Sequence, residues 1–475
     1  MADLPLWTPE ELIAATGGRI EGVVSKPLNG VAIDNRAIAP GDIFVAIKGE
    51  NHDAHDFAAS ALKAGAGIAM VSRTTQDMRD AGPLLIVADD PLRGLENLGI
   101  AGRQRSHAQI IGVTGSVGKT SSKEMLKVAL SASGLTHASA ASLNNHWGVP
   151  LTLARMPRQT AYAVIEIGMN HAGEITPLVG MAKPHTALVT SIAASHLGHF
   201  ASLGEIADAK AEIFSGVEPD GNAVINRDTP YFDQLSAAAR KFGIRNIVSF
   251  GRHAGADVRL EKLVLHTECC CVTAKVMGED VIYKLGLPGE HMALNSLGVL
   301  AAVKVMGADL ARAALALATA KPAKGRGVRE HLAIPGGDML LIDESYNANP
   351  ASVRAALSLL AQAQPKKSGR RIAILGDMLE LGAQGPALHA ELAPVLDEAK
   401  VDLVYAAGPL MANLWAKVPA GKRGNHAPTI AELRDEIVNA MRPNDVVMVK
   451  GSLGSKMGPL TDALRRAYPP VSKDI

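Results

Sequence analysis

Hydrophobic and polar positions follow two repeating patterns over most of the chain. Short apolar runs, such as 161–167 and 187–192, alternate with segments whose apolar residues recur every three or four positions. Continuous apolar runs are typical of strands buried in a parallel sheet, and the longer period is typical of amphipathic helices. The pattern therefore predicts an α/β fold with mostly parallel sheets.

Changes in this pattern divide the chain into three domains. Residues 1–107 combine strands at 31–33 and 43–47 with a helix at 57–64 and close on a polar stretch at 102–108, which predicts a small N-terminal α/β domain. Residues 108–322 form a central domain, where several short strands at 257–287 precede a helix at 290–305. The sequence K-P-A-K-G-R-G at 321–327 reads as a linker.

The third domain, 323–475, alternates strands and helices. Strands are predicted at 339–343, 371–375, 403–407 and 446–450, and helices near 351–363, 386–400, 429–441 and 455–467. This order predicts a Rossmann-like, doubly wound sheet.

Composition narrows the class of protein. The chain has 475 residues and a net charge of +1, so neither a basic nucleic-acid footprint nor an acidic tail is visible. No run reaches 18 apolar residues, and the first residues, M-A-D-L-P-L-W, lack the features of a secretory leader. The three cysteines are consecutive, at 269–271, which fits neither a metal site nor a disulfide framework. We expect a cytoplasmic multidomain enzyme without membrane insertion, acting as a monomer.

A glycine-rich turn at 112–120, G-V-T-G-S-V-G-K-T, lies between a predicted strand and a predicted helix. Backbone N–H groups and a helix N-terminus favour phosphate there, Lys119 is expected to reach terminal phosphates, and Thr120 to hold magnesium. Strict nucleotide-loop spacing places glycine at 113, where this chain has Val113. The turn therefore predicts a P-loop of variant form that binds a nucleoside triphosphate.

Two further side chains follow strands of the central domain. Glu166 ends the strand A-V-I-E, and ligands collect at the carboxyl ends of parallel strands, so we interpret it as a magnesium ligand rather than a turn cap. His196 also follows a strand. Taken alone, it is more often a hydrogen-bonded polar residue than a metal ligand.

Five segments resemble the ATP-dependent Mur ligases, which build the peptide of the bacterial cell-wall precursor. They are G-V-T-G-S-V-G-K-T-S at 112–121, S-L-N-N-H-W-G-V-P-L-T-L at 142–153, I-D-E-S-Y-N-A-N-P at 342–350, I-L-G-D-M-L-E-L-G at 374–382 and V-K-G-S at 449–452. The resemblance spans nearly the whole chain. The family loop has its glycine at the place of Gly115, which accounts for Val113.

The resemblance implies an N-terminal domain for the UDP-sugar end, a central P-loop ATPase and a C-terminal ligase domain, with ATP and Mg²⁺ as cofactors. It makes Lys119, Glu166, His196 and Lys210 catalytic, and Thr120, Glu166, His196 and carbamylated Lys210 the metal ligands. Carbamylation needs a neutral amine, hence a desolvated lysine with a lowered pKa. Without the resemblance, Lys210 is an ordinary helix lysine. The implied ATP contacts are Gly115, Ser116, Val117, Gly118, Lys119, Thr120, Ser121, Asn295 (adenine), Arg326 (phosphates) and Asp343 (ribose).

The resemblance also implies substrate contacts. The uridine side matches I-D-N-R at 33–36 and the segment 49–57, although the family more often has serine at Asn35 and glycine at Ala54. Leu453 stands where the family often has arginine. Taken alone, Asp34, Asn35, Asn144 and Asn145 read as turn residues. The substrate residues implied are Asp34, Asn35, Arg36, Asn144, Asn145, Tyr346, Asn347, Asn349, Lys450 and Ser452.

Among the activities of the family, the segments favour ATP-dependent addition of D-alanyl-D-alanine to UDP-N-acetylmuramoyl-tripeptide through an acyl phosphate. Both substrates are small molecules, and no nucleic acid is expected. A sister ligase that adds one amino acid, a folylpolyglutamate-type ligase and a P-loop switch or motor are the alternatives. The third peptide residue, diaminopimelate or lysine, is not fixed by the sequence.

Overall fold

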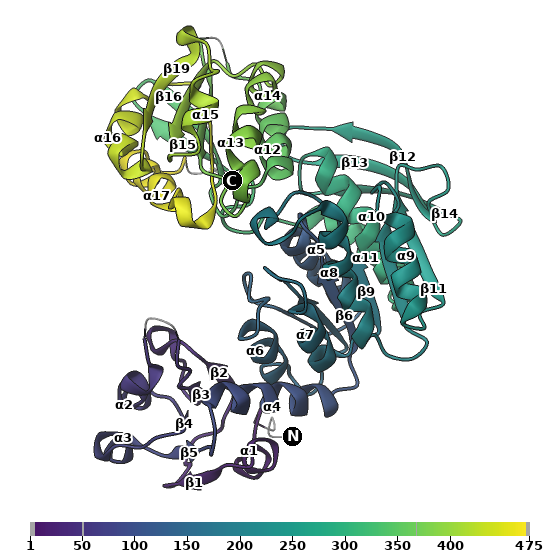
Figure 1. Ribbon diagram of the computed structural model, residues 1–475, viewed down its shortest axis with the longest axis vertical. Helices are drawn as coiled ribbons and strands as arrows, with labels where there is room; N and C mark the ends of the chain where they lie inside the picture. Colours follow the sequence, from purple (N-terminus) through teal and green to yellow (C-terminus); the bar gives the residue numbers. More distant parts are fainter. Residues whose placement is uncertain (1–4, 50–51, 367, 472–475) are drawn as a thin grey trace.

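Three sheets follow one another along an elongated molecule, seen in the computed structural model of Figure 1. The structure describes residues 5–49, 52–366 and 368–471. All three sheets are mostly parallel, with helices packed against them. The predicted α/β class and three-domain architecture are confirmed.

The N-terminal sheet has five strands in the order β1-β5-β4-β3-β2, with β1 antiparallel to β5 and the other pairs parallel. The elements of this part are α1 (Pro9–Thr16), β1 (Arg19–Glu21), β2 (Gly30–Ala32), β3 (Asp42–Val45), α2 (Ala58–Lys63), β4 (Ile68–Val71), α3 (Gln76–Ala81), β5 (Leu84–Ile86) and α4 (Pro91–Gln104). Residues 50 and 51 of the segment 49–57 lie outside the described residues.

The central sheet has nine strands in the order β14-β13-β12-β11-β10-β9-β6-β8-β7, antiparallel only across β12, β13 and β14. Its strands are β6 (Gln109–Thr114), β7 (Thr136–Ala138), β8 (Tyr162–Glu166), β9 (Thr186–Val189), β10 (Asn222–Asn226), β11 (Asn246–Gly251), β12 (Val258–Leu265), β13 (Cys270–Val276) and β14 (Glu279–Leu285). Its helices are α5 (Lys119–Ser131), α6 (Gly148–Ala154), α7 (Ile175–Ala182), α8 (Leu203–Ala211), α9 (Phe232–Lys241), α10 (Glu290–Val305) and α11 (Leu310–Ala316). The helix expected at 290–305 is α10.

The C-terminal sheet has six strands in the order β15-β16-β20-β17-β18-β19, parallel except for β15 against β16. Its strands are β15 (Val328–Ile334), β16 (Gly337–Glu344), β17 (Arg371–Gly376), β18 (Leu403–Ala407), β19 (Arg423–Ala427) and β20 (Val446–Lys450). Its helices are α12 (Pro350–Gln362), α13 (Gly385–Ala390), α14 (Ala393–Glu398), α15 (Ala412–Trp415), α16 (Ile430–Ala440) and α17 (Gly458–Ala467).

Two predicted elements differ from the structure. The single helix expected at 386–400 is divided into α13 and α14. Pro394 stands in the first turn of α14, where its missing N–H is tolerated, but in a continuous helix it would remove an internal hydrogen bond. The polar stretch expected at 102–108 begins inside α4, since Gly102 is helical and buried.

Helix α4 joins the N-terminal sheet to the central part of the molecule (Figure 1). A Cβ atom added at Gly102 would lie 2.5 Å from the carbonyl oxygen of Leu153 in α6, and one added at Gly99 would lie 2.9 Å from the Cα of Pro150. Backbones approach this closely only where side chains are absent. The two helices therefore pack backbone to backbone.

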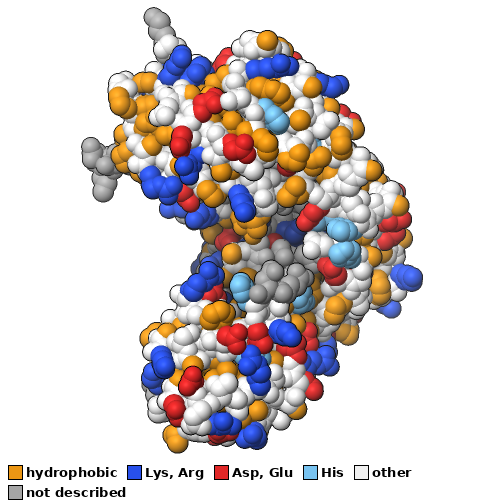
Figure 2. All heavy atoms as spheres, turned by 60° about the vertical axis from the view of Figure 1, so that its left-hand side comes forward, with side chains coloured by type: hydrophobic (Ala, Val, Ile, Leu, Met, Phe, Trp, Pro, Cys, Tyr) orange, Lys and Arg blue, Asp and Glu red, His pale blue; other side chains and the backbone are white. Residues whose placement is uncertain are grey.

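Within the described ranges, no helix is both long and apolar enough to cross a bilayer. Figure 2 shows a concave region between the C-terminal part of the molecule, at the top, and the N-terminal part, at the bottom.

Candidate active site

The glycine-rich turn connects β6 to α5 and fixes the position of Lys119. Gly115 has φ +145°, and an added Cβ would lie 2.0 Å from Thr190 Oγ1, so only glycine fits there. Lys119 Nζ donates to the Gly115 carbonyl at 2.6 Å. Val113 is fully buried in β6 and pairs with Glu166 of β8, so it is a core strand position rather than part of the turn.

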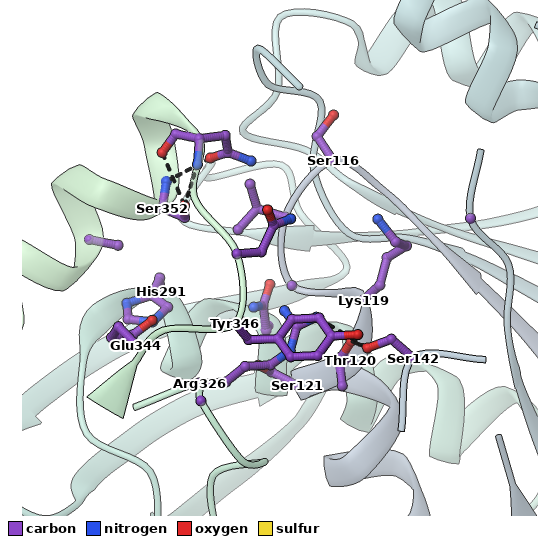
Figure 3. A pocket seen from close by; sticks show the side chains of 18 of the residues that line it. Ser116, Lys119, Thr120, Ser121, Ser142, His291, Arg326, Glu344, Tyr346 and Ser352 are labelled. Carbon is purple, nitrogen blue, oxygen red and sulfur yellow. Dashed lines mark hydrogen bonds between the residues drawn. The ribbon is translucent and has the colours of Figure 1, made fainter. Parts of the chain in front are cut away.

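Four side chains meet next to this turn, and Figure 3 labels two of them, Thr120 and Ser142. Thr120 Oγ1 donates to Glu166 Oε1 at 3.2 Å and lies 3.4 Å from Ser142 Oγ. Asn144 Nδ2 donates to the same Glu166 oxygen at 2.7 Å. The segment that carries Ser142 and Asn144 is thereby joined to the glycine-rich turn and to the end of β8.

Burial and positive charge define the electrostatics of this region. Burial lowers the pKa of Lys119, while Glu166 opposes that shift and Arg326 adds to it. Lys210 is 1% exposed, and burial, with a contribution from Lys119, holds its pKa well below the usual lysine range. In the part of the chain that the structure describes, its Nζ makes no hydrogen bond or ion pair. Lys210 is therefore a buried amine that favours the neutral form.

The opposite wall of the cavity comes from the C-terminal domain (Figure 3). The Arg326 guanidinium lies 4.4 Å from the centre of the Tyr346 ring, and its Nη2 donates to Ser142 Oγ at 3.2 Å. Lys450 Nζ is 3.2 Å from Glu344 Oε2 and donates to the Asn347 carbonyl at 3.0 Å. The loops after β16 and β20 thus face the glycine-rich turn.

Together these elements enclose one cavity. Its lining includes the turn, the end of β8, the first turns of α10 and α12 and the linker before β15. The polar residues that line it are Ser116, Lys119, Thr120, Ser121, Ser142, Asn144, Glu166, Asn170, His196, His291, Asn295, Arg326, Glu344, Tyr346, Asn347, Asn349, Ser352 and Lys450.

A second groove lies at the N-terminal domain. Asp34, Asn35 and Arg36 line one part of it, and Asn145, His146 and Trp147 of the central domain line another. The Arg36 guanidinium, hydrogen-bonded to Asp34, lowers the pKa of that carboxyl to about 2. The groove therefore combines ionised groups with aromatic side chains from two domains.

Comparison with known proteins identifies the family. The Mur ligase middle domain matches residues 113–303, the Mur ligase glutamate ligase domain matches 332–453, and the Mur ligase family catalytic domain matches 27–91. UDP-N-acetylmuramoyl-tripeptide–D-alanyl-D-alanine ligase of Escherichia coli is 36% identical over 96% of this chain and 98% of its own length. The same enzyme of Rickettsia prowazekii is 32% identical over 96% and 99%.

The chain belongs to the Mur ligase family. The crystal structure of MurF from Acinetobacter baumannii, 30% identical, superposes with a TM-score of 0.83 over 97% of this chain and 99% of that one. MurF of Thermotoga maritima, 23% identical, shares the fold with a TM-score of 0.74 over 93% of this chain and 98% of its own.

In this Mur ligase most of the site residues expected from the sequence meet in the first cavity. From the glycine-rich turn, Ser116, Val117, Gly118, Lys119, Thr120 and Ser121 line it, and they are joined by Asn144, Glu166, His196, Asn295, Arg326, Tyr346, Asn347, Asn349 and Lys450. An added Cβ at Gly118 would lie 2.7 Å from Asn295 Nδ2, so α10 packs directly on the turn. Asn349 also caps α12, accepting the Ser352 N–H at 2.8 Å.

Other expected residues lie elsewhere. Asp34, Asn35, Arg36 and Asn145 line the second groove. Asp343 is 1% exposed and holds Ser345 and Arg465 through its two oxygens, while its neighbour Glu344 faces the cavity. Ser452 is buried and accepts the Leu379 N–H. The roles of Asp343 and Ser452, like those of the other expected site residues, stay predictions.

Sequence reasoning assigned no role to Ser142, Glu344, His146 or Trp147. Ser142 and Glu344 lie in two of the segments that resemble the Mur ligases, 142–153 and 342–350. Their position close to the expected site residues of those segments was the signal that could have identified them. Trp147 follows Asn145 in the same way.

The donor set fits magnesium. Glu166 Oε2 is buried and, among the described residues, has no hydrogen-bond partner. No group of three or more His, Cys, Asp or Glu side chains within the described ranges is placed to hold a metal by itself. Magnesium typically takes one or two carboxylates and completes its shell with water and substrate phosphates. Glu166 and Thr120 beside the glycine-rich turn match that preference.

Proposed function

We propose that this ligase joins D-alanyl-D-alanine to UDP-N-acetylmuramoyl-tripeptide with ATP, releasing ADP and phosphate. The match to ligases of that activity over 96% of the chain carries the proposal. The two cavities support it, because a long substrate needs contacts for a nucleotide end and for a reacting end. The segment 142–147 lines both, through Ser142 and Asn144 in one and Asn145 and Trp147 in the other.

The reaction begins at the terminal carboxylate of the tripeptide. A carboxylate does not react with amines, because its leaving group would be an oxide. Transfer of the γ-phosphoryl group of ATP to that carboxylate gives an acyl phosphate, whose phosphate leaves readily. The amine of D-alanyl-D-alanine then attacks the acyl carbon, loses a proton, and displaces phosphate.

The residues of the first cavity have roles in this scheme. Lys119 and the N–H groups of the turn stabilise charge on the transferred phosphoryl group, and Arg326 adds a second cation beside the phosphates. Asn144 and Asn145 orient the muramoyl peptide. Tyr346, Asn347, Asn349, Lys450 and Ser452, at and after the carboxyl ends of β16 and β20, bind the incoming dipeptide and exclude water.

Magnesium would be held by Thr120, Glu166 and His196, with carbamylated Lys210 as a further ligand. It supplies Lewis-acid stabilisation of phosphoryl oxygens. Carbamylation joins the neutral Lys210 amine to carbon dioxide and releases a proton, and the lowered pKa of Lys210 supports it. Asn295 and Asp343 would contact adenine and ribose, and Asp34, Asn35 and Arg36 the uridine end.

We further propose domain limits of 1–107, 108–322 and 323–475, and a monomer that works in the cytoplasm without nucleic acid. Size-exclusion chromatography with light scattering tests the oligomeric state. An assembly larger than one chain would contradict it.

Phosphate release tests the reaction. Purified protein is given ATP, Mg²⁺ and UDP-N-acetylmuramoyl-tripeptide, and then D-alanyl-D-alanine, single amino acids or no acceptor. We expect release only with the dipeptide, formation of the pentapeptide product by mass spectrometry, and loss of both in Lys119→Ala. Release with a single amino acid instead indicates a sister ligase, and release that needs a protein partner indicates a switch.

A further inference from the structure

A direct contact joins the central and C-terminal domains beside the first cavity. His196 Nδ1 lies 2.5 Å from Glu380 Oε2. The neighbouring Gly198 N–H donates to the Glu380 carbonyl at 2.9 Å. His196 follows β9 of the central sheet, and Glu380 follows β17 of the C-terminal sheet. One side-chain contact and one backbone contact therefore tie the two loops together.

Both residues hold uncommon backbone conformations. His196 has φ +56° and Glu380 has φ +64°, in the left-handed region that side chains other than glycine seldom adopt. Such conformations persist where surrounding contacts impose them, and they concentrate at functional sites. Two of them in direct contact, from different domains, at the rim of a catalytic cavity point to a functional arrangement.

The loop that carries Glu380 is firmly held. Asp377 accepts the N–H groups of Leu410 and Met411, and His389 Nε2 accepts that of Met378. Ser452 Oγ accepts the Leu379 N–H at 2.9 Å. The position of Glu380 is thus set by the C-terminal domain and not by His196.

The two loops also fit closely as backbones. An added Cβ at Gly382, where φ is +57°, would lie 2.9 Å from the Cα of Gly198. That contact leaves no room for a side chain. The fit of Gly382 on Gly198 brings Glu380 to His196.

A carboxylate at this distance favours the His196 tautomer with its proton on Nδ1, which leaves the lone pair on Nε2. The Glu380 side chain is half exposed, and within the described residues the buried His196 Nδ1 has no other polar partner. Metal-binding histidines commonly donate their other ring N–H to a carboxylate, which fixes the ring and strengthens the ligand.

We propose that Glu380 is a positioning residue for His196, and that docking of the C-terminal domain completes the magnesium site through this pair. The inference rests on the proposed function, in which His196 is a metal ligand. It means that the metal is fully held only when the domain that binds the incoming amine is in place. Phosphoryl transfer is thereby restricted to the assembled site.

Manganese binding tests the proposal without turnover. Mn²⁺ replaces Mg²⁺, and its affinity for the protein with a non-hydrolysable ATP analogue is measured from the free-ion signal in electron paramagnetic resonance. The variants are Glu380→Ala, the isosteric Glu380→Gln, His196→Ala, the double variant Glu380→Ala/His196→Ala and Gly382→Ala. Glu398→Gln is the matched control, an exposed glutamate of the same domain. Thermal unfolding of each variant verifies the fold.

We expect Glu380→Ala to weaken Mn²⁺ binding about 10-fold, as loss of a partner of a metal-binding histidine does. Glu380→Gln keeps a hydrogen-bond acceptor and should lose less, and Gly382→Ala should behave like Glu380→Ala. The double variant should be no weaker than His196→Ala, because Glu380 acts through His196. Glu398→Gln should match the unchanged protein.

Two results overturn the proposal and are distinguishable. If His196→Ala weakens Mn²⁺ binding and Glu380→Ala does not, Glu380 has no positioning role and the proposed function stands. If neither variant changes Mn²⁺ binding, His196 is not a metal ligand, and the proposed metal site fails with the inference.

Discussion

Asn144 and Asn145 are adjacent in the chain, yet their side chains belong to different cavities. Asn144 donates to Glu166 in the first cavity, whereas Asn145 lines the second groove and accepts the N–H groups of Trp147 and Gly148 at the start of α6. These two adjacent residues therefore connect the first cavity to the groove of the N-terminal domain.

We expect the variants Asn144→Ala and Asn145→Ala to affect different properties of the enzyme. Asn144→Ala removes a hydrogen bond to Glu166 and should lower kcat about 10-fold or more, with an unchanged unfolding midpoint. Asn145→Ala leaves two backbone N–H groups at the start of α6 without their acceptor and should lower the free energy of unfolding by about 1 kcal/mol, together with a higher KM for the UDP substrate. Steady-state kinetics and urea unfolding measure both. Identical profiles for the two variants would contradict the assignment to separate cavities.

Substitutions at Gly115 and Val113 should affect different properties. We expect Gly115→Ala to affect ATP binding and Val113→Gly to affect stability. Gly115→Ala forces a Cβ against Thr190 and should abolish ATP binding, measured by calorimetry. Val113→Gly restores the usual nucleotide-loop spacing but empties a buried strand position, so it should cost about 2–4 kcal/mol of stability with no gain in ATP affinity. Tighter ATP binding by Val113→Gly would show that the variant turn has been misread.

Trp147 should report occupancy of the second groove. The other two tryptophans lie elsewhere: Trp7 is 1% exposed beneath Arg105, and Trp415 lies beside His426 in the C-terminal domain. Uracil bound near the indole should quench fluorescence, so UDP is expected to lower emission in the unchanged protein and to have little effect in Trp147→Phe. UDP that binds by calorimetry without quenching would place the nucleotide away from Trp147.

Lys210 should make activity depend on carbon dioxide. Its neutral amine is the form that adds carbon dioxide, so turnover should fall in carbonate-free buffer and recover with bicarbonate. Lys210→Arg cannot form the carbamate and should lose activity in both conditions. Equal turnover of the unchanged enzyme with and without bicarbonate would show that no carbamate at Lys210 contributes to the metal site.

Acid should destabilise the loop that carries Glu380. Burial lowers the pKa of His389, whose Nε2 accepts the Met378 N–H and whose Nδ1 contacts the Gly385 carbonyl. Because the folded-state pKa is below the unfolded value of about 6.5, the unfolded chain takes up the proton first, and stability is lost as the pH falls below 6.5. The urea midpoint should fall from pH 7 toward pH 5, and less in His389→Asn. The exposed control His107→Asn should keep the full dependence.

The strands and long helices of this fold were predictable because their signals are local. The helix at 290–305 has the predicted limits, since its apolar residues and the preceding Pro-Gly turn lie within one stretch of sequence. The division at Pro394 was missed because apolar periodicity continues across it. The apolar periodicity of a segment thus predicts that a helix is present better than it predicts where that helix is interrupted.

The sequence predicted which segments form the site. It did not predict how the side chains of those segments are oriented or which of them are in contact. Asp343 and Glu344 are neighbours, and alternation along β16 sends one to Arg465 and the other to the cavity. The sequence does not indicate which of the two side chains faces the cavity and which faces Arg465. The contact between His196 and Glu380 likewise depends on how two domains meet, which no spacing within either segment encodes.

The backbone contact between α4 and α6 has a consequence for substrate choice. With Gly99 and Gly102 against Pro150 and Leu153, the N-terminal sheet has little freedom to slide relative to the glycine-rich turn. The two cavities are then separated by a fixed span, and a nucleotide-linked peptide that is one residue too short cannot reach the phosphoryl donor while its other end is held. On this arrangement the nucleotide-linked peptide is selected by its length as well as by its chemistry.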